Sequence, residues 1–161
     1  MKRDSLAHGS GGGKVGFFQF AAGVAHQLNN PLMAVAGWAE LALRRGAPEP
    51  ALERVLEATG IAAAAVARLE QRLGHDRQAR ERAFSEERQR DHLGTLAALS
   101  ADVVQDLERA TDEVLQRARS AAPFIGAKAE RVVEQAERAR AIARELAASF
   151  RRLPARERGA V

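Results

Sequence analysis

The strongest indication of the fold of this chain is the segment FAAGVAHQLNNPLMAVAGWAELAL (residues 20–43). Its apolar side chains recur every three or four residues, which is the period of an amphipathic α-helix. At about 100° per residue, several of them fall on one face of such a helix. We expect this stripe to be buried: Phe20, Val24, Leu28, Val35, Trp38 and Ala42. A helix with one apolar stripe needs partner helices to cover it, so the stretch predicts a helical bundle.

The rest of the chain has the same helical character. Alanine, arginine, glutamate and leucine dominate the 161 residues, which favours helix. Two breakers, GAPEP (46–50) and APFIGAK (122–128), divide the pattern into hairpins. We therefore predict an all-α fold of two tandem antiparallel helical hairpins that form a four-helix bundle. The expected helices cover residues 16–45, 51 to at least 73, 93–120 and 127–152.

These breaks also predict the domain organisation. We expect a disordered tail over 1–15, a first hairpin over 16–75, a charged helical linker over 76–91, a second hairpin over 92–153 and a tail over 154–161.

The two hairpins resemble each other. ALERVLEA (51–58) is similar to AERVVEQA (129–136), and FAAGVAHQL (20–28) is similar to LAALSADVV (96–104). The offset is 76 or 77 residues, and the apolar stripe alone also allows 75. We interpret this as a duplication, so one chain can complete the bundle as a pseudo-dimer; pairing of hairpins between two chains is the alternative.

Composition excludes several classes of protein. The chain has no cysteine, so it has neither disulfides nor thiolate metal sites, and no histidine has convincing metal-ligand spacing. No run of about 18 apolar residues predicts a membrane span. The net charge is +4, but arginine and glutamate alternate instead of forming a basic face, so we expect no nucleic-acid partner. We expect a cytoplasmic protein.

One polar cluster interrupts the first helix. His26 lies about 160° from Val24, on the face opposite the apolar stripe, and Asn30 lies one turn further on. Pro31 is expected to kink or loosen the helix, because it lacks an N–H and its ring pushes against the carbonyl of Gln27. Such a cost in a regular helix often marks a functional site, and an exposed imidazole can act as a nucleophile.

The cluster resembles the phosphoacceptor box of sensor histidine kinases. The family pattern is a histidine, usually an acidic residue, an apolar residue, Asn or Arg, Asn or Thr, and then Pro-Leu. The residues here are His26, Gln27, Leu28, Asn29, Asn30, Pro31 and Leu32. The resemblance implies that residues 16–75 are a dimerisation and histidine-phosphotransfer unit, with His26 as the phosphorylated residue.

This chain departs from the family pattern in three places. No ATP-binding domain follows the hairpins, so we expect no autonomous ATP-dependent kinase activity. Gln27 replaces the acidic neighbour, and a neutral amide cannot serve as a base. In the second hairpin, Asp102 or Val103 stands where the first has His26, so that hairpin is expected to be degenerate.

The resemblance also implies a partner. A response-regulator receiver domain would supply the aspartate and Mg²⁺ for phosphoryl transfer, and this chain would need no cofactor of its own. Met33, Gly37 and Glu40 would contribute to the docking surface, and a separate histidine kinase is a second expected partner.

In the family, the residue at the position of Asn30 is linked to hydrolysis of the receiver's aspartyl phosphate, so Gln27 and Asn30 would favour phosphatase character.

Three functions therefore compete. The first is phosphate exchange between His26 and a receiver, or promotion of receiver dephosphorylation. The second is a non-catalytic bundle that binds or sequesters a response regulator or a kinase. The third is a structural bundle, against which the intact box from His26 to Leu32 argues.

Overall fold

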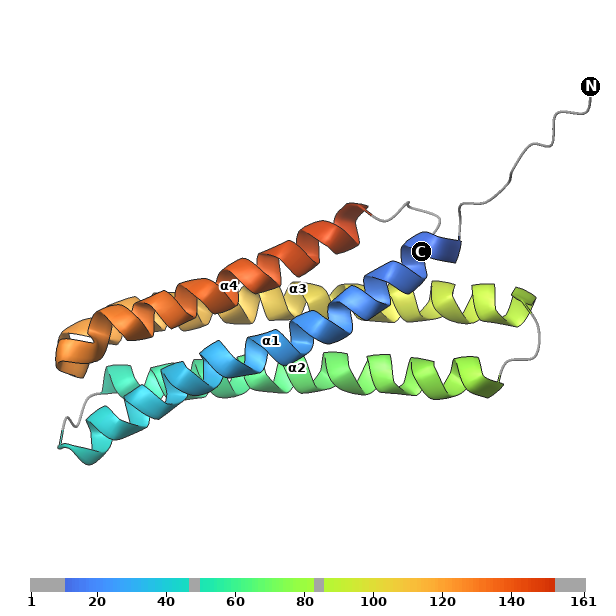
Figure 1. Cartoon of the computed structure of the whole chain (residues 1–161). Helices are drawn as coiled ribbons and strands as arrows, with labels where there is room; N and C mark the ends of the chain where they lie inside the picture. Colours follow the sequence, from blue (N-terminus) through green and yellow to red (C-terminus); the bar gives the residue numbers. More distant parts are fainter. Residues whose placement is uncertain (1–10, 47–49, 83–85, 153–161) are drawn as a thin grey trace, which may run out of the picture.

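Four long α-helices make up most of the chain (Figure 1). The computed structural model describes residues 11–46, 50–82 and 86–152, and no strand occurs among them. The elements are α1 (Gly11–Arg44), α2 (Pro50–Arg82), α3 (Glu86–Ile125), the short 3₁₀ helix η1 (Gly126–Lys128) and α4 (Ala129–Arg152). The predicted all-α fold of helical hairpins is confirmed.

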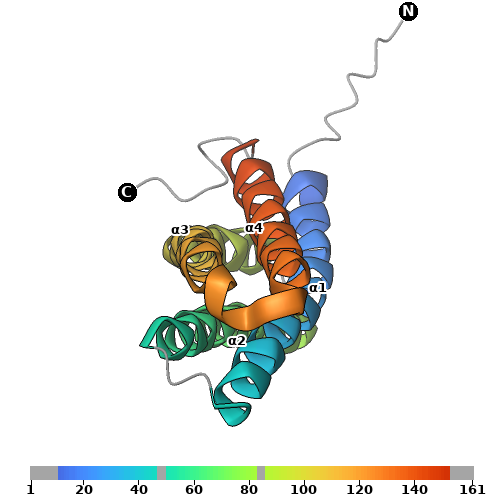
Figure 2. The same cartoon turned by 90° about the vertical axis from the view of Figure 1, so that its left-hand side faces the viewer.

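The helices run alternately in opposite directions around a common axis (Figure 1 and Figure 2). α1 packs against α2 and α4, and α3 packs against the same two helices, while α1 and α3 lie diagonally with far fewer contacts. The two hairpins of one chain thus form a four-helix bundle. This is the arrangement expected of an intrachain pseudo-dimer, and pairing between two chains stays a prediction.

One apolar core runs along this axis and takes residues from all four helices. Its largest fully buried side chains are Leu28, Leu32, Val35, Leu52, Val55, Val66, Leu69, Val103, Leu107, Val114, Val132 and Leu146. Two threonines share the core, Thr59 and Thr111, and each hydroxyl donates to the carbonyl four residues earlier, at 2.6 and 2.9 Å respectively. Among the described residues, no helix combines the length and hydropathy needed to cross a bilayer.

Glycines end the first helix of each hairpin. Gly46 has φ of +89° and its N–H donates to the carbonyl of Leu43 at 3.0 Å, just after α1 ends. Gly126 has φ of +76° and follows α3 directly. Only glycine adopts this left-handed conformation without steric cost, so both predicted breakers work through their glycine.

Pro123 does not end α3, although the sequence predicted an end near Ser120. The helix continues through this proline to Ile125. Proline removes one backbone donor but keeps a helical φ, so a helix near its end can accommodate it at the loss of one hydrogen bond. The predicted helix end was wrong because α3 ends just before Gly126 and not before Pro123.

Other boundaries also differ from the expected ones. α1 begins at Gly11, inside the segment expected to be a disordered tail, because glycine lowers helix propensity without forbidding helix. α2 continues past Gly74 to Arg82, and α3 begins at Glu86, so the charged linker is mostly helical as predicted. Most of the two predicted tails, residues 1–10 and 153–161, lies outside the described part, and so do residues 83–85 of the predicted linker.

The buried stripe of α1 is largely as predicted, with two exceptions. Val24, Leu28, Val35 and Ala42 are buried, but Phe20 is 37% exposed and Trp38 is half-buried. Phe20 and Trp38 both lie at one edge of the stripe, about 40° from Val24. The angular pattern alone could not tell whether a neighbouring helix covers that edge.

Burial corrects the offset between the hairpins. Adding 79 to the residue number takes the buried Val24, Leu28 and Val35 of α1 to the buried Val103, Leu107 and Val114 of α3. An offset of 77 would pair buried Leu28 with the exposed Gln105. Offsets of 76 and 75 would pair buried Leu32 and Ala42 with the half-buried Glu108 and Arg117, respectively.

In the second helices, by contrast, the predicted offset of 77 holds. It takes Val55, Ala62 and Leu69 of α2 to Val132, Ala139 and Leu146 of α4, and all six are buried. The turn between α3 and α4 is shorter than the turn between α1 and α2, which accounts for the change of offset inside the hairpin.

Candidate functional site

α1 presents a single exposed stripe on the outside of the bundle. Its members are spaced by four, three, four and three residues, which keeps them on one face of a helix. They are His26, Asn30, Met33, Gly37 and Glu40, and each is exposed. We call these five residues the outer stripe. The sequence predicted His26 and Asn30 on this face, and Met33, Gly37 and Glu40 as part of a docking surface.

His26 stands without a partner on this stripe. Neither His26 nor Asn30 has a hydrogen-bond or ion-pair partner within the described part of the chain. Gln27 is also exposed, and the nearest stripe residues, Asn30 and Met33, carry no charge. The imidazole is therefore open to a molecule that approaches α1 from outside the bundle.

The two adjacent asparagines have different surroundings. Asn29 is half-buried, and its Nδ2 donates to Oε1 of Glu70 on α2 at 3.5 Å. Asn30 points to the outside, one helical turn after His26. The seam between α1 and α2 thus holds one carboxamide and leaves the other beside the imidazole.

Pro31 lies inside α1 and faces the core. It is buried, and the helix continues on both sides of it. Because proline has no N–H, the carbonyl of Gln27 lacks its usual donor four residues later. A missing donor in the backbone ladder therefore lies directly beside His26, and the kink expected at Pro31 stays a prediction.

Comparison with known families identifies this hairpin. A family model, His Kinase A (phospho-acceptor) domain, matches residues 18–75. Residues 18–75 are a His Kinase A phospho-acceptor domain. No curated protein matches the chain significantly, and neither does any solved structure.

The match supports a histidine kinase phosphoacceptor-like module of two-component signalling at residues 18–75. It begins shortly before the outer stripe and ends at residue 75 in α2, so the second hairpin lies outside it. The phospho-acceptor domain therefore supplies two of the four helices, and α3 and α4 of the same chain supply the rest of the bundle.

The second hairpin lacks the acceptor residues. With the offset of 79, Gln105 takes the place of His26 and Arg109 takes the place of Asn30; both are exposed. The sequence had placed Asp102 or Val103 there, and Val103 is only 2% exposed, so it cannot match an exposed histidine. The second hairpin thus has no histidine at the position of His26, as predicted, but the corresponding residue is Gln105.

An acidic residue of the kind that the family has after its histidine is present in the second hairpin. Asp106 follows Gln105 there, and its Oδ2 pairs with Nη2 of Arg68 on α2 at 3.4 Å. In the phospho-acceptor domain itself, the same place is taken by the neutral Gln27. Sequence comparison with an offset of 76 could not pair these two positions.

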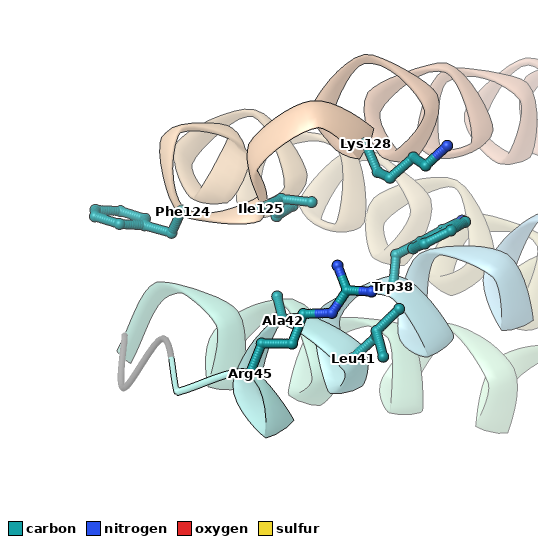
Figure 3. Close-up of a pocket in the computed structure, with 7 residues that line it drawn as sticks. All are labelled: Trp38, Leu41, Ala42, Arg45, Phe124, Ile125 and Lys128. Carbon is teal, nitrogen blue, oxygen red and sulfur yellow. The ribbon is translucent and has the colours of Figure 1, made fainter.

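Away from His26, a hollow opens at the end of the bundle (Figure 3). It lies between the last turns of α1 and the α3–α4 connection, and Lys128 Nζ stands 5.6 Å from the centroid of the Trp38 ring. The other lining residues are Leu41, Ala42, Arg45, Phe124 and Ile125. Trp38 is twelve residues from His26, about 18 Å along the helix, so the hollow is separate from the acceptor.

Within the described residues, no group of three histidine or carboxylate side chains is placed to hold a metal ion. The neighbours of His26 on the outer stripe carry no carboxylate until Glu40, fourteen residues further along α1.

Proposed function

We propose that this chain exchanges a phosphoryl group between His26 and the aspartate of a response-regulator receiver domain, or promotes dephosphorylation of that receiver. The observation that carries the proposal is an exposed, unpartnered histidine on the outer stripe of a phospho-acceptor domain. A buried or ion-paired imidazole could not meet an aspartyl phosphate carried by another protein.

The chemistry needs little from this chain. In the forward step, an imidazole nitrogen of His26 attacks the phosphorus of the receiver's aspartyl phosphate in line with the leaving carboxylate; the P–N bond forms as the P–O bond breaks. The reverse step returns the group to the aspartate. Mg²⁺ would arrive with the receiver, because Gln27, Asn30 and Met33 offer it no carboxylate.

Dephosphorylation would use the carboxamides beside the imidazole. Asn30 lies one turn from His26 and has no partner within the described chain, so its amide is available to orient a water molecule against the aspartyl phosphate. Gln27 is neutral and cannot take a proton from His26 as a carboxylate would. Both features favour the phosphatase direction over the acceptance of phosphate from ATP.

The docking surface would continue along the outer stripe. Met33 is 72% exposed, an unusual place for a large apolar side chain, and Gly37 lets another backbone approach α1 closely. No side chain fills the space where a Cβ of Gly37 would stand. Glu40 would add a charge at the far end of this surface.

Labelling experiments test the proposal. The chain is incubated with labelled ATP, a histidine kinase and a receiver, and His26→Gln serves as the matched variant because glutamine cannot form the P–N bond. We expect label on the wild-type chain only when kinase and receiver are both present, and none on the variant. Label on neither form, with the receiver still bound and its loss of label not accelerated, would favour the sequestering module instead.

A further inference from the structure

The seams of the two hairpins differ in chemistry although their cores correspond. On the outside of the α3–α4 seam, Asp112 Oδ1 pairs with Arg140 Nε at 2.8 Å and with Arg144 Nη2 at 3.3 Å. About two turns further along α3, Arg119 Nη2 pairs with Glu137 Oε1 at 2.8 Å. We call these five residues the ion-pair zipper.

Of the five corresponding positions in the phospho-acceptor hairpin, four carry small or apolar residues and one carries a glutamate. With the offset of 79 for the first helices, Asp112 corresponds to Met33 and Arg119 to Glu40. With the offset of 77 for the second helices, Glu137, Arg140 and Arg144 correspond to Gly60, Ala63 and Ala67, and all three small residues are exposed. The side that has the histidine therefore has no zipper, and the side that has the zipper has no histidine.

This asymmetry has a physical consequence for docking. A protein that covers the α3–α4 seam must take the zipper charges out of water, which is costly unless it offers matching charges. Where the zipper stands, the α1–α2 seam instead has Met33, Gly60, Ala63 and Ala67, and the described residues form no ion pair between its two helices, which are joined by the Asn29–Glu70 hydrogen bond at 3.5 Å. A protein that covers this seam therefore gains apolar contact and takes fewer paired charges out of water. The α1–α2 seam is also continuous with His26, where the reacting aspartate must arrive.

We propose that the bundle is one-sided: each chain binds one receiver domain, across the α1–α2 seam, and the ion-pair zipper closes the α3–α4 seam to a second. This inference rests on the proposed function, since it names the face and the number of receivers that serve His26. A bundle built from two identical phospho-acceptor hairpins would offer two such faces. Here, the second hairpin completes the bundle, but its α3–α4 seam does not bind a receiver.

Stoichiometry tests the proposal directly. The full chain is mixed with a tenfold excess of a receiver that exchanges label with His26, and native mass spectrometry counts the bound receivers per chain. We expect one receiver per chain at saturation. Two receivers per chain would overturn the proposal, while leaving the phosphotransfer function intact.

A transplanted zipper tests which face is used. The variant Met33→Asp/Ala63→Arg/Ala67→Arg places the zipper residues on the α1–α2 seam, where the α3–α4 seam shows that the same spacing forms ion pairs. We expect receiver affinity to fall at least tenfold, with circular dichroism and the melting temperature showing a folded bundle. Met33→Ala is the milder second variant, expected to weaken binding less; it disturbs little of the fold because Met33 is 72% exposed.

The matched control removes the zipper from the other face. Asp112→Ala/Arg140→Ala/Arg144→Ala should leave receiver affinity within twofold of the wild type. If this control loses binding while the transplanted zipper keeps it, the receiver docks on the α3–α4 seam and the proposal is wrong. Absence of label on His26 in the wild-type chain, with no faster loss of label from the receiver, would instead mean failure of the proposed function itself.

Discussion

Asn29 on α1 donates through Nδ2 to Glu70 Oε1 on α2 at 3.5 Å, while its neighbour Asn30 faces away from the seam without a partner in the described chain. Two identical side chains thus stand in adjacent positions with different surroundings. One belongs to the packing between two helices, and the other lies beside the exposed imidazole. This difference provides an internal control for the phosphatase role.

We predict that Asn30→Ala lengthens the lifetime of a phosphorylated receiver several-fold in the presence of this chain. The reason is that the alanine cannot orient the attacking water beside the aspartyl phosphate. The measurement is the decay of labelled receiver with wild type and variant. Asn29→Ala is the control and should leave the decay close to that of the wild type; equal decay with all three proteins would count against a role for Asn30.

We predict that His26→Gln abolishes labelling of the chain without destabilising it. The side chain is exposed and has no partner in the described chain, so the free energy of unfolding should change by less than about 0.5 kcal/mol. Urea denaturation followed by circular dichroism measures this change, alongside the labelling assay. A large loss of stability would mean that His26 has a structural role that its exposure does not indicate.

We predict that Pro31→Ala stabilises the bundle and reduces phosphotransfer. Proline inside a helix costs about 3 kcal/mol, partly offset by about 1 kcal/mol from the stiffer unfolded chain. Because Pro31 is buried, the alanine also loses some packing, so we expect a net gain of about 1 kcal/mol. Urea denaturation gives the stability, and the rate of label exchange with a receiver gives the function.

The result would separate two roles of the proline. A gain in stability with slower exchange would show that the weakened backbone beside His26 serves the site at a cost to the fold. A gain in stability with unchanged exchange would leave Pro31 without a functional role. A loss of stability would mean that the packing of its ring exceeds the cost of the missing hydrogen bond.

We predict that Leu28→Ala and Leu107→Ala each destabilise the whole bundle by about 2–5 kcal/mol in a single transition. Both side chains are fully buried, and they occupy corresponding places in the two hairpins. Since one core joins all four helices, a cavity in either hairpin should weaken both. Two separate unfolding transitions in either variant would show that the hairpins fold independently.

The helical pattern of the sequence was sufficient to predict most of the buried and exposed positions of α1. Residues 20–43 repeat their apolar side chains at the helical period, and the structure buries Val24, Leu28 and Val35 while leaving His26 exposed. The edge of the stripe was not predictable: Phe20 lies within about 40° of Val24 and is still 37% exposed. Whether an edge residue is covered depends on the neighbouring helix, which periodicity within one helix does not report.

Local backbone preferences and the 3.6-residue period were enough to predict a helical chain that turns back at Gly46 and near Gly126, with His26 and Asn30 on one outward face. The correspondence between the hairpins, by contrast, depends on packing between helices. The internal sequence repeat suggested offsets of 76 or 77, but the pattern of buried residues aligns α1 with α3 at an offset of 79. A shared core fixes the register more strictly than sequence similarity among alanine-rich helices does. That register brings Asp112 opposite Arg140 and leaves Met33 in the corresponding place on the open side, a difference that depends on contacts between helices far apart in the chain.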